Sequence, residues 1–243
     1  MGPRISIRGK GEVDCFCSNN YLGLANHPDV VEAGIEGLRK YGAGTSSVRF
    51  ICGTFVPHEA LENRIASFLG VEASYTFVSC WNATESIFPT LCQDGDVIVS
   101  DELNHACIID SMRLATAIHR GVTKCIYKHS DMDSLREALV AAIEKCSDDG
   151  NIFVITDGVF SMEGDIALLP AIRSLCDEFG AVLVVDDSHG TGVMGETGRG
   201  THEHYGMAGC DIDIFTGTLG KALGGGAGGY VAGKKEVVAL LVQ

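Results

Sequence analysis

Long apolar runs and clusters of basic residues are both missing from this sequence of 243 residues. No uninterrupted apolar stretch is long enough to span a bilayer, and residues 1–10 lack the apolar centre of a signal peptide. The chain has 18 Lys and Arg against 32 Asp and Glu, a formal net charge of −14. This acidic balance argues against nucleic acid and acidic membranes as partners. We therefore expect an intracellular protein, cytoplasmic or, in a eukaryote, in the mitochondrial matrix.

Metal-binding cysteine spacings are missing as well. The chain has 10 cysteines, yet none form a CxxC pair, and only Cys15 and Cys17 lie near each other in sequence. We expect small core residues or free thiols in a reducing compartment, and no bound metal. Internal repeats, low-complexity tracts and linkers are also missing. We expect one large domain over residues 13–243 after a short, basic and featureless segment, residues 1–12.

Strand-like and helical patterns alternate along the chain. The spacing predicts strands at residues 13–17, 75–79, 97–100, 125–127, 152–156, 181–185 and 211–216, and helices at 28–42, 57–69, 82–92, 106–116, 132–146 and 169–179. Continuous apolar runs such as Val-Leu-Val-Val at 182–185 are typical of parallel strands buried on both faces. The pattern therefore predicts an α/β fold, a mostly parallel sheet covered by helices on both faces.

Three of the predicted helices carry an apolar stripe. The stripes are Val30, Val31, Ile35 and Leu38; Leu61, Ile65 and Phe68; and Leu135, Leu139, Ala142 and Ile143. A further helical pattern begins near Lys235 and is still apolar at the end of the sequence. We therefore expect the chain to be the core of a longer protein.

Polar side chains follow most of the predicted strands, at the edge where open α/β sheets bind ligands. Cys80, Trp81 and Asn82 follow the strand at 75–79, and Asp101, Asn104 and His105 follow the strand at 97–100. Asp157 and Ser161 follow the strand at 152–156, and Thr218 and Lys221 follow the strand at 211–216. The strand at 181–185 is followed by Asp186, Asp187, Ser188 and His189. Loops need fewer functional groups than this for solubility alone. We expect these side chains to form one site.

Lys221 is the residue around which this site is organised. It follows a glycine break at 217–220 and has no adjacent carboxylate, so burial would lower its pKa and make it an amine nucleophile that forms a Schiff base. An ordinary surface lysine is the alternative. An acid after a buried strand, a histidine three residues later and an aromatic ring complete the set that pyridoxal phosphate needs. Helix-start amides would hold its phosphate.

Other short patterns point to other ligands. Residues 190–195 match the GxGxxG pattern of dinucleotide sites, but no helical pattern follows. Residues 217–221 look like part of a P-loop, but Ala222 stands where Ser or Thr is required. His202 and His204 flank Glu203, a set that can bind metal or simply face solvent.

Six motifs in order resemble the α-oxoamine synthases. They are SNNYLGLANHP (18–28), SSVRFICGT (46–54), SDELNHACIID (100–110), TDGVFSMEGD (156–165), VVDDSHGTGVMGETGRGTHE (184–203) and GTLGKALGGGAGGY (217–230). The resemblance implies the large domain of a fold-type-I, pyridoxal-phosphate-dependent acyltransferase. It is nearest to the members that condense glycine with acetyl-CoA, and less near to those that make 8-amino-7-oxononanoate or 5-aminolevulinate.

The resemblance also assigns roles by position. It implies that Lys221 bonds the cofactor aldehyde, that Asp186 pairs with the pyridinium nitrogen and that His189 hydrogen-bonds the phenolic oxygen. It further implies that His105 stacks on the ring, that Ser161 lies in the cofactor site, and that Cys80, Trp81 and Thr218 lie near the phosphate. Asn19, together with His105 and Ser161, is implied to lie near the amino-acid substrate. A homodimer with its active site between subunits is implied too.

The sequence departs from the family pattern in several places. Trp81 stands where Phe or Tyr is usual, Cys107 replaces a serine, and Gly190 and Thr191 replace an Ala-Val or Ala-Thr pair. We expect the family's small C-terminal domain, with its arginine for the substrate carboxylate, to be missing from this chain. Three alternatives stay open: a related synthase with another acyl-CoA or amino acid, an inactive fragment that keeps the fold, and a nucleotide-binding module.

Overall fold

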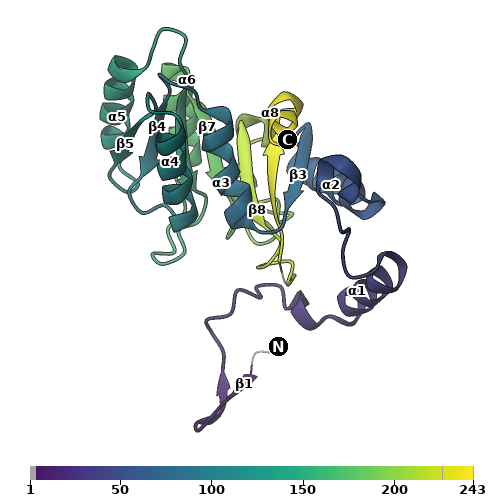
Figure 1. The fold of residues 1–243 in the computed structure, drawn as a ribbon. Helices are drawn as coiled ribbons and strands as arrows, with labels where there is room; N and C mark the ends of the chain where they lie inside the picture. Colours follow the sequence, from purple (N-terminus) through teal and green to yellow (C-terminus); the bar gives the residue numbers. More distant parts are fainter. Residues whose placement is uncertain (1–3, 226, 243) are drawn as a thin grey trace.

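A computed structural model describes residues 4–225 and 227–242. Its centre is a seven-stranded sheet with the order β3-β9-β8-β7-β6-β4-β5 (Figure 1). The strands are β3 (Ala73–Phe77), β4 (Val97–Asp101), β5 (Thr123–Tyr127), β6 (Ile152–Asp157), β7 (Val182–Asp186), β8 (Ile214–Thr218) and β9 (Gly229–Gly233). Neighbours from β8 to β5 pair in parallel, whereas β9 is antiparallel to both β3 and β8. The predicted mostly parallel α/β sheet is confirmed.

Helices cover the sheet on both faces, as expected from its buried strands. One core packs α2 (Val56–Leu69), α5 (Met132–Lys145) and α6 (Leu169–Phe179) against the sheet. The other core packs α3 (Cys80–Leu91), α4 (Ala106–Ile118) and α8 (Lys235–Leu240) against the opposite face. Every residue of β4 and of β6 is buried. Two-sided burial explains why these strands lack polar alternation.

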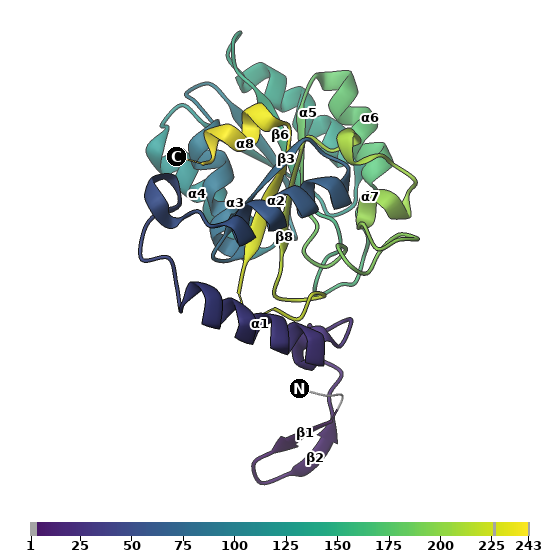
Figure 2. The same ribbon diagram turned by 90° about the vertical axis from the view of Figure 1, so that its right-hand side faces the viewer.

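The N-terminal part lies apart from these layers. Strands β1 (Arg4–Ile7) and β2 (Gly11–Asp14) form a hairpin, followed by α1 (Pro28–Tyr41) (Figure 2). The expectation that residues 1–12 are featureless is therefore wrong for the described part, and the predicted domain boundary at residue 12 falls inside β2. The strand predicted at 13–17 reaches only the last two residues of β2.

Helix α1 has the predicted ends but not the predicted environment. Pro28 is its first residue, His27 Nδ1 accepts a hydrogen bond from the Asp29 amide, and Gly42 ends it at φ +80°. None of its residues is buried, and Leu38 of its apolar stripe is 60% exposed. The stripe therefore has no partner among the described residues.

Several element boundaries differ from the sequence patterns. Helix α3 begins at Cys80 rather than at residue 82, because Ser79 Oγ caps it by accepting from the Asn82 amide at 3.2 Å. Strand β8 begins at Ile214, since Gly209–Asp211 form a 3₁₀ turn. On α5, Ile143 is 53% exposed and Ala138 takes its place in the core. No helix of the described residues is both long and apolar enough to cross a membrane.

Candidate active site

The carboxyl ends of the strands enclose a cavity of about 140 Å³. Eleven residues line it: Cys80, Trp81, His105, Cys107, Asp157, Ser161, Asp186, Ser188, His189, Thr218 and Lys221. The structure therefore brings together every residue to which the family resemblance gives a role except Asn19. Four polar residues that were expected in the same site from their places after the strands do not line the cavity: Asn82, Asp101, Asn104 and Asp187. The Asn19 side chain is exposed and reaches the site only through Tyr21, whose hydroxyl donates to Asn19 Oδ1 at 3.2 Å.

Lys221 and His189 form the polar contact at the centre of this cavity. Lys221 Nζ lies 2.6 Å from His189 Nε2. Burial lowers the pKa of Lys221 below its ordinary value, and the nearby Asp186 carboxylate partly opposes this. Burial, together with the charge of Lys221, lowers the pKa of His189 to about 4. His189 is therefore neutral at physiological pH.

Tyr21 contacts the other side of the same imidazole. Its hydroxyl oxygen lies 2.7 Å from His189 Nδ1. When Lys221 is an ammonium it donates to Nε2, so the single proton of neutral His189 sits on Nδ1 and is donated to Tyr21. Tyr21 could not be predicted as a site residue from local pattern because it lies 168 positions from His189, and the signal for it was its place in the SNNYLG motif.

Asp186 ends β7 with 3% of its surface exposed. Its carboxylate accepts hydrogen bonds from the Thr84 hydroxyl at 3.2 Å and from the Ser188 amide at 3.1 Å. The thiols of Cys80 and Cys107 lie 3.8 Å and 4.0 Å from Oδ2. Burial and the charge of Asp186 raise the pKa of Cys80 to about 12 and raise that of Cys107, so both thiols stay protonated.

His105 is held at the start of α4. Its amide donates to Asp157 Oδ2 at 2.9 Å, and its Nδ1 accepts from the Cys107 amide at 3.2 Å. The Cys107 Sγ lies 2.9 Å from the same Nδ1, and the ring stands edge-on to Trp81 with centroids 6.0 Å apart. Burial, with a further contribution from Asp186, raises the pKa of Asp157 well above its ordinary value.

The third element of the site is the N-terminus of α3. Cys80 and Trp81 are its first two residues, and the first amides of a helix have no intrahelical partner. A side chain at Gly229 would meet the Cys80 backbone at 2.4 Å, so only glycine allows β9 to pack against this helix start. Helix starts of this kind bind phosphate.

These groups match the chemistry of pyridoxal phosphate. Lys221 offers an amine for the aldehyde, Asp186 offers a carboxylate for the ring nitrogen, and α3 offers amides for the phosphate. His105 and Trp81 add aromatic rings to the lining of the cavity. The residues therefore fit this cofactor.

The GxGxxG pattern at 190–195 has a structural explanation. Asp187 is fully buried and accepts hydrogen bonds from the Thr201 amide at 2.9 Å and from the Thr191 hydroxyl at 3.3 Å. A Cβ at Gly190 would meet Asp187 Oδ1 at 2.1 Å, so this glycine makes room for a carboxylate rather than for a pyrophosphate. The dinucleotide interpretation has no support in this geometry.

The alternative metal site has no support in the geometry either. His202 is 2% exposed and packs edge-on against Phe215, with ring centroids 5.0 Å apart. Within residues 4–225 and 227–242, no group of three His, Cys, Asp or Glu side chains is placed to hold a metal.

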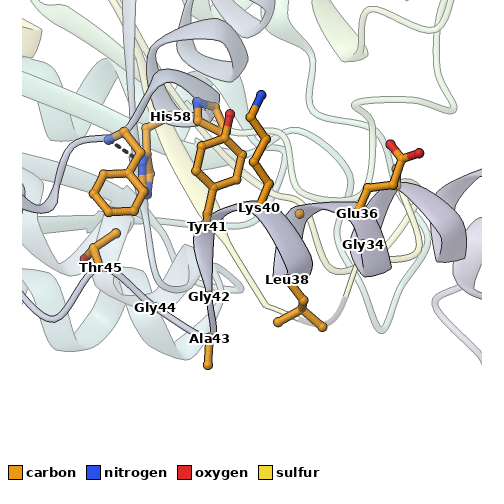
Figure 3. A pocket seen from close by; sticks show the side chains of 14 residues that line it. Gly34, Glu36, Leu38, Lys40, Tyr41, Gly42, Ala43, Gly44, Thr45 and His58 are labelled. Carbon is orange, nitrogen blue, oxygen red and sulfur yellow. Dashed lines mark hydrogen bonds between the residues drawn. The ribbon is translucent and has the colours of Figure 1, made fainter.

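A larger hollow, of about 630 Å³, lies between α1 and the start of α2 (Figure 3). Its walls come from the C-terminal half of α1, the 42–45 loop and the first turn of α2. Lys40 and Glu36 are its only Lys, Arg, Asp or Glu side chains. An imidazole, that of His58, lines it too, but His58 Nδ1 accepts from the Phe55 amide at 3.0 Å and Lys40 Nζ lies 5.1 Å from the centre of the Tyr41 ring, so these groups contact their own neighbours rather than one another.

Curated relatives match nearly the whole chain. The chain is 47% identical over 239 residues to 2-amino-3-ketobutyrate coenzyme A ligase of Salmonella typhimurium, covering 98% of this chain and 58% of the relative. It is 48% identical over 243 residues to 8-amino-7-oxononanoate synthase of Geobacter sulfurreducens, covering 100% of the chain and 59% of the relative. The chain thus spans less than two thirds of the length of these relatives.

Solved structures give the same result for the fold. Sphingomonas wittichii serine palmitoyltransferase superposes with a TM-score of 0.88 at 30% identity, over 98% of this chain and 57% of that one. The 8-amino-7-oxononanoate synthase of Francisella tularensis superposes with a TM-score of 0.76 at 28% identity, over 94% and 60%. The predicted fold-type-I class, the resemblance to α-oxoamine synthases and the pyridoxal phosphate cofactor of that class are confirmed. Since residues 14–243 also match the profile of aminotransferase class I and II, the chain belongs to that family.

Proposed function

We propose that the whole protein is a pyridoxal-phosphate-dependent acyltransferase that condenses glycine with acetyl-CoA to give 2-amino-3-oxobutyrate and CoA. This is the activity of glycine C-acetyltransferase, also named 2-amino-3-ketobutyrate coenzyme A ligase. The observation that carries the proposal is the convergence of Lys221, Asp186 and the α3 N-terminus on one cavity. The match to ligases of that name supports the substrate pair.

Each part of the cofactor has a candidate partner in the cavity. Asp186 would pair with the ring nitrogen, the α3 amides and Thr218 would hold the phosphate, and Lys221 would bond the aldehyde. His189 would hydrogen-bond the phenolic oxygen, and His105 would cover a ring face. The bound ring supplies an electron sink for the pair left when a proton leaves the glycine carbon.

Lys221 carries the proton transfer in this proposal. A base must be neutral before it accepts a proton, and burial lowers the Lys221 pKa in that direction. His189 lies 2.6 Å away and is itself neutral, so it adds no positive charge and orients the amine through a hydrogen bond. Thr84 and Ser188 orient the Asp186 carboxylate in the same way.

A substrate panel tests the proposal directly. CoA release is measured from the full-length protein with glycine, alanine or serine, each paired with acetyl-CoA or a longer acyl-CoA. We expect the highest kcat/KM for glycine with acetyl-CoA. A kcat/KM at least tenfold higher for a longer acyl-CoA would instead favour the second candidate, an 8-amino-7-oxononanoate type of synthase, which the 48% identity to that enzyme supports. Cofactor binding without CoA release from any pair would favour a catalytically inactive protein that keeps the fold.

The exposed stripe of α1 supports a homodimer. Val30, Val31 and Leu38 are 42%, 44% and 60% exposed, and Phe50 and Ile51 of the following loop are 66% and 72% exposed. Large apolar side chains that form an exposed patch usually mark a protein interface. We propose that a second copy covers it and completes the active site, and that the enzyme serves threonine and glycine metabolism in the cytoplasm or the mitochondrial matrix.

A further inference from the structure

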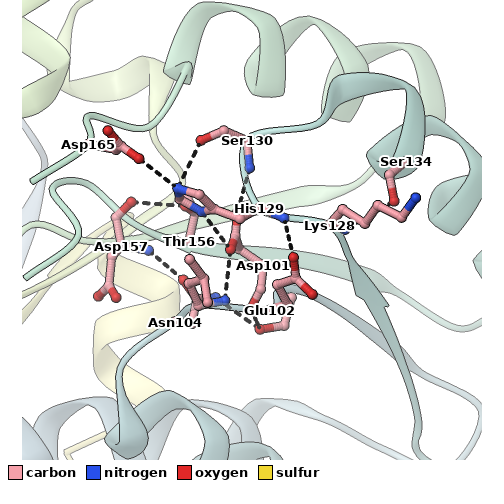
Figure 4. Close-up of polar contacts among 12 residues, drawn as sticks. Asp101, Glu102, Asn104, Lys128, His129, Ser130, Ser134, Thr156, Asp157 and Asp165 are labelled. Carbon is pink, nitrogen blue, oxygen red and sulfur yellow. Dashed lines mark hydrogen bonds and ion pairs between the residues drawn. The ribbon is translucent and has the colours of Figure 1, made fainter. Parts of the chain in front are cut away.

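A histidine outside the cavity joins two loops that follow different strands. His129 lies just after β5, and its Nδ1 is 3.0 Å from Asp101 Oδ1 at the end of β4 (Figure 4). Its Nε2 is 3.2 Å from Asp165 Oδ2 in the loop after β6. The His129 side chain is 15% exposed and that of Asp101 is 2% exposed. Solvent therefore screens the contact with Asp101 only weakly.

The loop after β6 carries Ser161 into the candidate active site. The Phe160 amide donates to the Asp165 carbonyl at 2.9 Å, and the Gly164 amide donates to the Phe160 carbonyl at 2.8 Å. These bonds close a short tip, residues 161–164, between Phe160 and Asp165. His129 contacts both flanks of the tip. Its Nε2 contacts the Asp165 carboxylate on one flank, and on the other the ring of Phe160, which is 1% exposed, lies edge-on to the imidazole with centroids 4.3 Å apart.

The backbone after His129 is shaped for the same contact. Ser130 has φ +53°, a conformation that is uncommon for a residue other than glycine. Its amide donates to Asp101 Oδ2 at 3.2 Å, while the His129 amide donates to Glu102 Oε1 at 3.0 Å. Both carboxylates thus hold the turn that presents the imidazole.

We propose that His129 is a positioning residue, which fixes the 161–164 tip through Phe160 and Asp165 and so places Ser161 at the cofactor cavity. The effect on the cofactor rests on the proposed function, because it assumes that Ser161 faces bound pyridoxal phosphate. The tip is held most firmly when His129 is protonated and pairs with both carboxylates.

The charges that surround His129 determine its pH dependence. Asp101 and Glu102 approach from β4 and the turn after it, Asp165 from the loop after β6, and Lys128 precedes it in the chain. Burial lowers the pKa of His129, but hydrogen bonds and charge from Asp101 and Asp165 outweigh burial and raise it above its ordinary value. The stabilisation is therefore complete below about pH 6.5 and is lost as pH rises through the raised pKa.

Two further titratable groups lie next to the Asp101 carboxylate. Tyr127 is a neighbour on β5, and its pKa is raised by burial and by the charge of Asp101. Asp157 ends β6, and its pKa is raised by burial and by Asp186, with a smaller contribution from Asp101. The raised pKa keeps Tyr127 protonated, and comparison with His129→Gln separates the titration of His129 from that of Asp157.

Hydrogen exchange by mass spectrometry tests the tip without any cofactor. Peptides covering residues 158–167 are compared at pH 6 and pH 9, after correction for intrinsic exchange, in the unmodified protein and in His129→Gln. In the unmodified protein we expect the protection of these amides to fall by about fivefold from pH 6 to pH 9, equal to about 1 kcal/mol. In His129→Gln we expect their protection to be low at both pH values. His119→Gln is the control, because His119 Nε2 contacts the Pro89 carbonyl at 3.1 Å, away from the tip. Equal pH dependence in His129→Gln and the unmodified protein would overturn the proposal.

Pyridoxal phosphate binding supplies the second readout. We expect the dissociation constant to rise by about fivefold in His129→Gln at pH 6, and Asp165→Asn to reproduce the effect. Asp165→Asn also serves if His129→Gln fails to fold, because the Asp165 side chain is 60% exposed. If the unmodified protein does not bind pyridoxal phosphate, the proposed function is refuted. The exchange data would in that case still decide whether His129 holds the tip. Unchanged affinity in both variants would refute the link to the cofactor.

Discussion

Helices α1 and α5 have the same length, 14 residues, and similar apolar stripes, yet their surroundings are opposite. Leu135, Leu139 and Ala142 of α5 are fully buried against the sheet. Three of the four stripe residues of α1 are exposed, Leu38 most of all at 60%, and Ile35 is half-buried. An apolar stripe therefore predicts that a helix has a partner, but not that the partner belongs to the same chain.

The largest expected difference between the two helices is in stability. Leu139→Ala removes a fully buried side chain from α5 and should lower the free energy of unfolding by about 2–5 kcal/mol. Leu38→Ala changes an exposed side chain of α1 and should alter that free energy in the monomer by about 0.5 kcal/mol or less. Urea unfolding of dilute protein measures both. Equal losses in the two variants would show that α1 packs within its own chain.

A buried carboxylate and an exposed carboxylate should also differ in how strongly they make the free energy of unfolding depend on pH. Burial raises the pKa of Asp187 to about 7, although hydrogen bonds from Thr201 oppose the shift. Between about pH 4 and 7 the folded state keeps a proton that the unfolded state loses, so Asp187 makes stability fall by about 2–4 kcal/mol as pH rises. Asp187→Asn should remove that slope in unfolding experiments across this range.

The matched control for this slope lies on α1. Asp29→Asn changes a side chain that is 93% exposed, and the pH slope of stability should stay as in the unmodified protein. A slope that survives in Asp187→Asn would mean that Asp187 is not the group that titrates.

The oligomeric state of variants should also distinguish α1 from α5. Val31→Asp places a charge on the α1 stripe and should weaken the proposed homodimer by at least about tenfold, because an unpaired charge would be buried in the interface. Ile143→Asp on α5 is the control, since Ile143 is 53% exposed and lies outside the α1 surface. Sedimentation velocity over a concentration series measures the dissociation constants. Equal effects of the two substitutions would argue against α1 as the interface.

A smaller effect is expected where the N-terminal part meets the site. Tyr21→Phe removes the 2.7 Å hydrogen bond to His189 and should raise the dissociation constant of pyridoxal phosphate about fivefold. Tyr75→Phe is the control, because Tyr75 lies on β3 and its ring contacts Phe77 and Arg49. If both variants bind the cofactor as the unmodified protein does, Tyr21 does not position His189.

The body of the fold could be predicted from the sequence because its signals are local. Two-sided burial gives the apolar run at 182–185, and parallel strands bring their carboxyl ends to one edge, so the residues after those strands were expected to meet. Local pattern also gave both ends of α1, through Pro28 and Gly42.

The rest depends on contacts that no local pattern records. Tyr21 meets His189 across 168 residues, and its role follows only from the folded chain. The start of α3 was placed two residues late because the strand pattern runs into Ser79, which is the helix cap. Asn19 was expected beside the substrate by resemblance alone, and that role remains a prediction because its side chain lies outside the cavity.

The most direct measurement asks which lysine bonds the cofactor. The protein is incubated with pyridoxal phosphate, reduced with borohydride, digested and mapped by mass spectrometry, with Lys221→Ala as the paired variant. We predict a stable pyridoxyl label on the peptide that contains Lys221, and no label in the variant, since Lys221 is the lysine that lines the cavity. A label on Lys234 or Lys235 instead, or equal labelling of Lys221→Ala, would contradict the assignment of the site.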